Sequence, residues 1–230
     1  MIRLFVSDDL KNNTDIYLSD TTLHYLKNVM RRAEGDEILL FNGKDGEWLS
    51  QIKTLTKKQG ILTLIRQTRP QILEKRLILC PALIKKENFD GVLQKPTELG
   101  ATDIYPLITE RTVVSKLNLE RATSIVREAS EQCERLSLPT LYSPLKLTDL
   151  FKNLPPDIQP VCLSERGQTT APLTTQKTYA FCVGPEGGWT PSELAFFEKN
   201  NTIFWHLGTT ILRAETASVS ALACAQFIFK

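Results

Sequence analysis

Two glycine-containing segments near the C-terminus could together hold a small ligand. The first is GPEGG at 184–188, which follows the apolar run YAFCV, and the second covers 207–213, which follows IFWH. Glycine permits positive φ angles and lets a ligand approach the backbone closely. In open α/β sheets, ligands lie just beyond the carboxyl ends of the strands. We therefore expect the two segments to line one pocket, although GPEGG taken alone is also typical of a plain tight turn.

The second segment carries the side chains that suggest chemistry. We expect Leu207, Ile211 and Leu212 to cover the face of an adenine ring whose edge is read by backbone groups. Arg213 and Glu215 would then be the charged groups nearest to the reacting atoms, or, alternatively, a surface ion pair that contributes little. The segments lack the G-x-G-x-x-G pattern of dinucleotide sites and the Walker pattern of P-loops.

The amino-acid composition of the whole chain argues against several classes of protein. Hydrophobic residues make up 42% and charged residues 23% of the 230 residues, which predicts a packed core rather than disorder. Five cysteines are never closer than 20 residues apart, and His24 and His206 have no neighbour at ligand spacing, so we expect buried thiols and no metal site. No apolar stretch is long enough for a membrane span or a signal peptide, so we expect a cytoplasmic protein without a membrane partner.

Charge is distributed unevenly along the chain. Residues 1–86 contain 15 Lys and Arg against 10 Asp and Glu, whereas the remainder contains 13 against 16. A surface that faces phosphates gives such an asymmetry, because clustered cations release counterions on binding. Chance explains it equally well.

The elements that must position these segments fall into two groups. Residues 1–70 predict a small β-rich domain with one helix after Ser19 or Asp20 and strands at 37–42, 47–55 and 61–67. That helix has apolar residues Leu23, Leu26, Val29 and Met30 at helical spacing.

From residue 71 onward, strands alternate with helices, which predicts an α/β domain with a mainly parallel sheet. Strands are expected at 76–83, 103–108, 160–164, 179–183 and 203–207, and helices at 87–100, 119–136 and 215–229. Thr190, Pro191 and Glu193 form the pattern of a capping box, so GPEGG is expected to join a strand to a helix. The last helix is apolar nearly all round, which favours burial in the core or against a second subunit.

Several motifs together resemble one known family. GPEGG at 184–188 and LG-x-x-ILR-x-ETA at 207–217 are similar to motifs of the RsmE family of 16S rRNA methyltransferases, a branch of the SPOUT superfamily. The segments at 24–36, 94–114 and 128–139 are also similar to that family, so the resemblance covers most of the chain.

The resemblance implies a PUA-like RNA-binding β-barrel domain over 1–70 and a SPOUT methyltransferase domain with a deep trefoil knot over 71–230. It implies a homodimer packed through the knotted domain and S-adenosyl-L-methionine (SAM) as methyl donor. It further implies methylation of uracil N3 in 16S rRNA of the small ribosomal subunit, at uridine 1498 in the family. The implied cofactor-binding residues are Leu163, Val183, Gly184, Pro185, Glu186, Gly187, Gly188, Leu207, Gly208, Ile211, Leu212 and Arg213.

For this reaction, Glu215 is the candidate base and Arg213 the candidate group that stabilises charge on the uracil carbonyls. RNA phosphates are expected to contact the cations Lys27, Arg31, Arg32, Lys85 and Lys86.

Two positions depart from the family pattern. Pro96 predicts a kink or break in the helix near Lys95, and Thr210 stands where the family usually has arginine. Two rival functions remain: methylation of another RNA atom such as a ribose 2′ oxygen, and RNA binding without catalysis.

Overall fold

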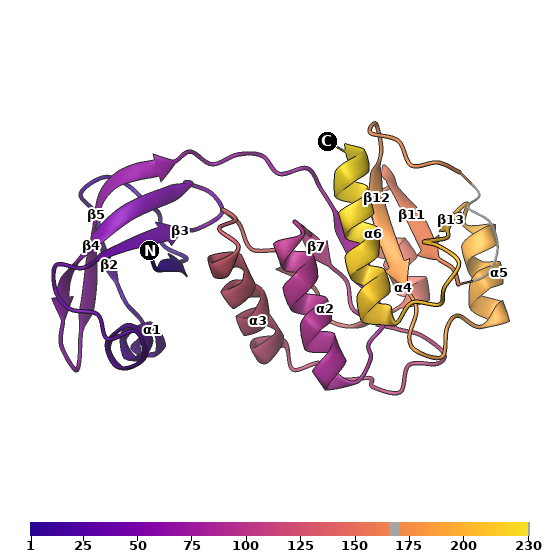
Figure 1. Cartoon of the computed structure of the whole chain (residues 1–230), viewed down its shortest axis with the longest axis horizontal. Helices are drawn as coiled ribbons and strands as arrows, with labels where there is room; N and C mark the ends of the chain where they lie inside the picture. The colour runs from indigo at the N-terminus through magenta and orange to yellow at the C-terminus, as the bar shows by residue number, and fades with distance from the viewer. Residues whose placement is uncertain (166–170, 230) are drawn as a thin grey trace. The chain divides into compact units, whose positions relative to one another are not determined.

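The computed structural model describes residues 1–165 and 171–229 of the chain. Its internal contacts divide the chain into two compact units, and Figure 1 labels most of their helices and strands. The first unit comprises Met1–Leu73 and Ser130–Leu138, and the second comprises Glu74–Ala129 and Pro139–Lys230. The first unit is therefore completed by a short segment from the middle of the chain.

A five-stranded sheet in the order β1-β3-β4-β5-β2 forms the first unit. The strand β1 runs parallel to β3, and the other neighbours are antiparallel. Leucine and isoleucine side chains from all five strands form its core. The three predicted strands are present, but β1 and β2 were missed because three-residue strands are too short to show alternation. The bounds are β1 (Arg3–Phe5), β2 (Asp15–Tyr17), β3 (Glu37–Phe41), β4 (Glu47–Leu55) and β5 (Gly60–Arg69).

The predicted helix of this unit is present and shorter than expected. It consists of α1 (Asp20–His24) followed by one π-helical turn, η1 (Tyr25–Val29). The Ser19 hydroxyl accepts a hydrogen bond from the Thr22 N–H and so caps the helix, as predicted. Leu23 and Leu26 are buried, but Val29 is 58% exposed and does not extend the apolar face.

A buried arginine joins the two segments of the first unit. The Arg3 Nε atom donates to Glu47 Oε2 at 2.7 Å, and its two Nη atoms donate to the backbone carbonyls of Ser130, Glu131 and Arg135 at 2.9–3.2 Å. Ser130 and Glu131 lie in the last turn of α3 (Leu119–Gln132). Arg3 therefore satisfies carbonyls that a helix end leaves without an intrahelical partner.

A six-stranded sheet in the order β13-β11-β12-β6-β7-β9 forms the centre of the second unit. All five pairs in it are parallel, which confirms the predicted parallel sheet. The predicted strand at 103–108 is divided into β7 and β8, and β8 pairs with β10 outside the main sheet. The bounds are β6 (Ile78–Pro81), β7 (Asp103–Ile104), β8 (Leu107–Ile108), β9 (Thr140–Leu141), β10 (Leu145–Lys146), β11 (Ile158–Leu163), β12 (Thr178–Val183) and β13 (Ile203–Trp205).

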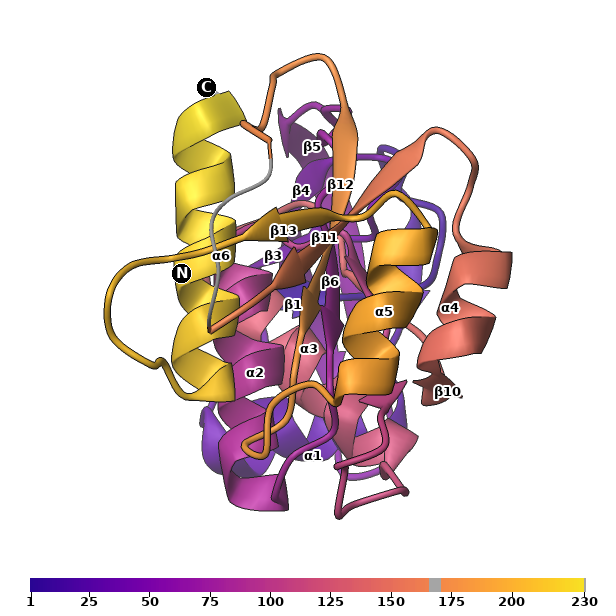
Figure 2. The ribbon, with the colours of Figure 1, turned by 90° about the vertical axis from the view of Figure 1, so that its right-hand side faces the viewer.

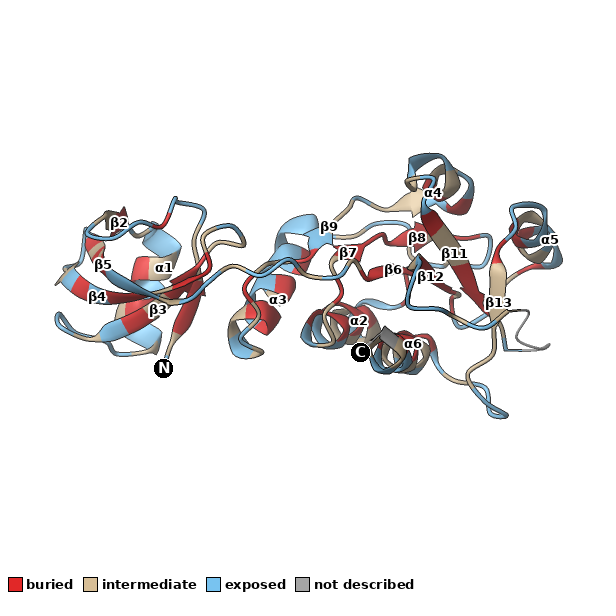
Figure 3. Cartoon of the chain, turned by 90° about the horizontal axis from the view of Figure 1, so that it is seen from above, coloured by how far each residue is buried: buried red, intermediate tan, exposed pale blue. Residues whose placement is uncertain are grey.

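Helices cover both faces of this sheet. One hydrophobic cluster joins the sheet to α2, α3 and α6, and a second cluster joins its other face to α4 and α5. Figures 2 and 3 show α2 and α6 on one side of the sheet and α4 and α5 on the other. The predicted helices are present, whereas α4 was missed because seven residues give little periodicity. The bounds are α2 (Lys86–Glu98), α4 (Leu147–Asn153), α5 (Pro191–Lys199) and α6 (Ala214–Phe229).

Three expectations were wrong in detail. The helix break near Lys95 does not occur, because α2 continues through Pro96 and ends only at Glu98. The helix α3 ends at Gln132 instead of 136, since the chain turns at Glu134 with φ 60°. Cys224 is exposed and Cys133 is half-buried, although the other three cysteines are buried as expected.

Candidate functional site

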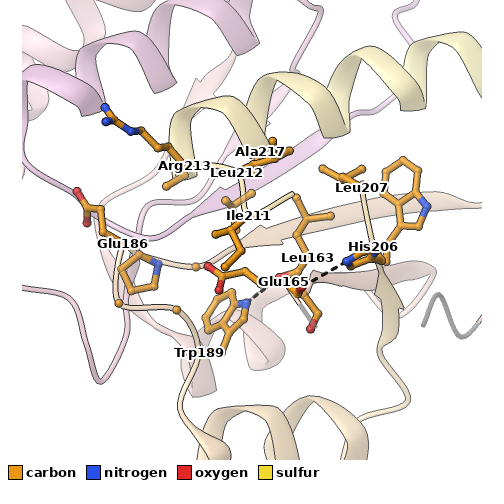
Figure 4. Close-up of a pocket in the computed structure, with 18 of the residues that line it drawn as sticks. Leu163, Glu165, Glu186, Trp189, His206, Leu207, Ile211, Leu212, Arg213 and Ala217 are labelled. Carbon is orange, nitrogen blue, oxygen red and sulfur yellow. Dashed lines mark hydrogen bonds between the residues drawn. The ribbon is translucent and has the colours of Figure 1, made fainter. Parts of the chain in front are cut away.

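Three parallel strands end at the same edge of the second sheet and open onto one pocket. β11 lies between β12 and β13, so Leu163 at the end of β11 separates the two glycine-containing loops. The pocket has a volume of about 530 Å³ and is lined by both loops (Figure 4). Every residue that the family resemblance implied for cofactor binding lines it. The sheet order therefore brings together residues that lie up to 50 positions apart.

The first loop has a rigid exit into α5. Thr190 accepts a hydrogen bond from the Glu193 N–H at 3.2 Å, and the Glu193 carboxylate accepts one from the Thr190 N–H at 2.9 Å, which confirms the capping box. The Gly188 N–H donates a hydrogen bond to the Pro185 carbonyl at 2.8 Å. Gly188 has a φ of 68°, which lies in the left-handed region that favours glycine. A Cβ at Gly184 would meet the Trp189 indole at 3.1 Å. Glycine at 184 thus makes room for a tryptophan.

The second loop leaves its backbone available. Within the part of the chain that the structure describes, residues 207–212 make no hydrogen bond. Gly208 has φ 140°, and an added Cβ there would meet open space. Figure 4 shows Leu163, Leu207 and Ile211 gathered along the pocket. Unpaired amides and carbonyls beside apolar side chains suit a ligand with a flat apolar face and a polar edge.

The two candidate catalytic residues differ in their position relative to the pocket. Arg213 is exposed and lines the pocket, and its carbonyl accepts the Ala217 N–H at 2.8 Å where α6 begins. Glu215 follows in the first turn of α6 and does not line the pocket. One of its carboxylate oxygens, Oε2, is buried and has no hydrogen-bond partner. The structure therefore brings Arg213, but not Glu215, to the pocket wall.

Comparison with known proteins gives the family. Residues 71–226 match an RNA methyltransferase domain, and residues 18–65 match an RNA methyltransferase PUA domain. Ribosomal RNA small subunit methyltransferase E of Rickettsia conorii is 34% identical over 96% of this chain and 93% of its own length. The Synechocystis enzyme of the same name is 32% identical over 96% of this chain and 76% of its own.

This chain belongs to the RsmE family.

A solved relative agrees with this assignment. The crystal structure of ribosomal RNA small subunit methyltransferase E from Neisseria gonorrhoeae, bound to S-adenosyl methionine, superposes with a TM-score of 0.92 at 27% identity. The similarity covers 100% of this chain and 98% of that one. The family member described here thus combines an N-terminal PUA-like domain with an α/β methyltransferase domain.

The RsmE-family pocket also contains residues that the sequence did not reveal. Trp189 donates from its indole Nε1 to the Leu163 carbonyl at 3.0 Å, and Arg111 donates to the Gly187 carbonyl at 2.6 Å. Trp189 adjoins GPEGG, so its position could have suggested it. Arg111 lies 76 residues before Gly187, and no local pattern connects the two. The remaining additional lining residues are Ser164, Glu165, Pro191, Leu194, Trp205, His206, Thr210, Ala214 and Ala217.

The predicted RNA-binding cations occur in both units. In the first unit, Lys27 lies in η1, and Arg31 and Arg32 follow it on the surface, with Arg32 3.8 Å from Asp36. In the second unit, Lys85 and Lys86 are exposed at the start of α2. Lys27 is half-buried whereas the other four cations are exposed, and their contact with RNA stays a prediction.

Other chemistries find little support in the described parts of the chain. Across residues 1–165 and 171–229, no group of three His, Cys, Asp or Glu side chains could hold a metal ion. Over the same residues, no helix has both the length and the apolar character that a bilayer span needs. Burial raises the pKa values of the Cys80 and Cys162 thiols well above the usual range of a cysteine. Both thiols therefore remain protonated and are poor nucleophiles.

Proposed function

We propose that this chain transfers a methyl group from SAM to N3 of a uridine in 16S rRNA of the small ribosomal subunit, at the family's position 1498. The observation that carries the proposal is the pocket itself. An unpaired loop backbone and a glycine-rich loop face each other across three parallel strand ends. The family to which the chain belongs indicates the substrate.

The residues of the pocket fit SAM. A volume of about 530 Å³ lies within the range of small-molecule sites. The backbone of residues 207–212 would pair with the adenine edge, and Leu163, Leu207 and Ile211 would cover its face. When bound, SAM supplies a methyl group activated by its sulfonium. The N. gonorrhoeae relative holds the same cofactor.

The uracil needs help because N3 carries a weakly acidic proton. We propose that Glu215 accepts this proton and that Arg213 stabilises the charge that develops on the uracil carbonyls. The first role is supported by the position of Glu215 next to the pocket-lining Ala214 and by its Oε2 atom, which has no hydrogen-bond partner. The position of Arg213 on the pocket wall supports the second.

Methyl transfer to purified small ribosomal subunits tests the proposed function. Subunits from a strain without this modification are incubated with the protein and SAM, and the nucleosides are identified by mass spectrometry. We expect 3-methyluridine that depends on SAM. A 2′-O-methyl nucleoside would favour the rival reaction, and RNA binding without any methylated product would favour a binding protein.

The same assay tests the RNA contacts. Replacing both Lys27 and Lys86 by Glu should raise the KM for ribosomal subunits. The KM should also depend less steeply on the salt concentration, because fewer counterions are released on binding. The dissociation constant for SAM should stay unchanged. An unchanged KM would place the RNA elsewhere. We also propose a cytoplasmic location, because the proposed substrate is the small ribosomal subunit.

We further propose that the C-terminal part of the second domain forms a deep trefoil knot. Its support is that the chain belongs to the RsmE family, for which the sequence resemblance implies this topology. Knots of this kind are rare, so sequence rules alone do not predict one. An experimental backbone trace through residues 184–229 tests this topology.

We also propose that the chain is a homodimer through this domain. The helix α6 buries Ala221 and Leu222 on one side but exposes Cys224 and Phe227 on the other, with Phe227 83% exposed. An apolar helix face of this kind is typical of a subunit interface. A second copy of the chain is the proposed occupant.

The expected result of Phe227→Glu is therefore a monomer, because a carboxylate cannot be buried without a partner. Light scattering after gel filtration should give about 26 kDa for the variant and twice that mass for the wild type. Val113→Glu is the control, since Val113 is 91% exposed on a loop outside α6. A dimeric Phe227→Glu variant would contradict the proposed interface.

A further inference from the structure

A turn far from GPEGG in the sequence is attached to it in the fold. Residues 109–112 follow β8 and close on themselves, since the Thr112 N–H donates to the Thr109 carbonyl at 3.2 Å and the Thr109 N–H donates to the Thr112 hydroxyl at 3.0 Å. Arg111 at the tip of this turn lines the pocket. The turn therefore has a fixed shape and carries one cation to the cofactor loop.

Arg111 contacts that loop with both its charge and its stem. Its Nη1 atom donates to the Gly187 carbonyl at 2.6 Å and lies 3.5 Å from the Trp189 carbonyl. A Cβ added at Gly187 would come within 3.3 Å of Arg111 Cδ and 3.4 Å of its Cβ. The stem of Arg111 therefore packs close to the α-carbon of Gly187, and an added methyl group there would require Arg111 to shift.

The start of α5 holds the same turn. The Glu193 side chain is buried, and its two oxygens accept the Glu110 and Thr190 N–H groups at 2.9 Å each. The Ser192 hydroxyl donates to the Glu110 carboxylate at 2.8 Å. Hydrogen bonds from Ser192 and Thr190 lower the pKa of Glu110, so the carboxylate stays charged at neutral pH. The turn is thus fixed to the helix on one side while Arg111 reaches the loop on the other.

We propose that Arg111 is a positioning residue that holds the GPEGG loop in the shape that binds SAM, a role that rests on the proposed function. The guanidinium fixes the direction of the Gly187 carbonyl, and the stem limits how the loop can shift toward the turn. The other guanidinium donors have no partner within the described chain and are not needed for this role. Loss of Arg111 should weaken SAM binding without slowing methyl transfer at saturating SAM.

The test compares Arg111→Met with the wild type in calorimetric titrations with SAM. The methionine keeps a stem against Gly187 but removes the donor, so the dissociation constant should rise about tenfold, as expected for one lost charge-assisted hydrogen bond. Arg111→Lys should recover part of this loss. Arg121→Met is the matched control, because Arg121 pairs with Asp90 away from the pocket. The effect of Arg111→Met should fall on the KM for SAM more than on kcat, and a fall in kcat alone would contradict a positioning role.

A double-mutant cycle tests the packing of the stem. Gly187→Ala should weaken SAM binding in the wild type and less so beside Arg111→Ala, since the added methyl no longer meets Cδ. Additive effects would overturn the packing argument. An unchanged SAM affinity in Arg111→Met would overturn the proposal, and a raised KM for ribosomal subunits in that case would make Arg111 an RNA contact. A wild-type protein that binds no SAM would instead overturn the proposed function itself.

Discussion

Replacing Glu215 by Gln should lower the turnover rate by about 10²- to 10⁴-fold while leaving the affinity for SAM unchanged. Glutamine keeps the shape of the side chain in the first turn of α6 but cannot accept a proton. The lost rate therefore measures the contribution of a general base. Single-turnover methyl transfer to small ribosomal subunits is the appropriate measurement, because it separates chemistry from product release.

The dependence on pH distinguishes this role from a structural one. As the pH rises, an increasing fraction of the uracil loses its N3 proton without help, so the variant should recover toward the wild-type rate. Glu186→Gln is the control, since Glu186 lines the pocket where Glu215 does not. A rate deficit that stays constant with pH, or a large loss in Glu186→Gln alone, would remove Glu215 from the base role. A loss of stability at normal rate would make Glu215 a helix-end residue that interacts with the helix dipole.

Replacing Arg3 by Met should destabilise the first unit by about 3–5 kcal/mol. The change leaves the buried Glu47 carboxylate without the Arg3 Nε donor at 2.7 Å. It also leaves the carbonyls of Ser130, Glu131 and Arg135 without their donors. Hydrogen exchange of peptides from β3 to β5, followed in increasing urea, measures the effect within this unit.

The control is Lys44→Met, because Lys44 pairs with Asp9 at 2.8 Å on the surface and such pairs contribute less than about 1 kcal/mol. Combining Arg3→Met with Glu47→Gln should recover part of the loss, since the buried charge is then gone. Equal destabilisation by Arg3→Met and Lys44→Met would show that the buried pair is no stronger than a surface pair. Exchange that accelerates only in peptides of the second unit would contradict the assignment of Arg3 to the first.

The sequence by itself determined the features that depend on near neighbours along the chain. Ser19 caps α1 and Thr190 forms a capping box with Glu193, because each cap needs residues only three positions apart. The alternation of apolar runs with helical patterns predicted the parallel sheet, and the GPEGG and LG-x-x-ILR-x-ETA motifs predicted the two loops that line the pocket.

Features that depend on distant partners were decided only by the tertiary structure. The order of strands places β11 between β12 and β13, which gives Leu163 its place between the loops. Arg111 donates a hydrogen bond to the carbonyl of Gly187, which lies 76 positions later in the chain, and Arg3 donates one to the carbonyl of Ser130, which lies 127 positions later. Both Cys162 and Cys224 were expected to be buried, but only Cys162 is, and of the two candidate catalytic residues only Arg213 lines the pocket. The physical reason is that local propensity depends on neighbouring residues alone, whereas strand order, burial and side-chain partners depend on which surfaces pack together when the whole chain folds.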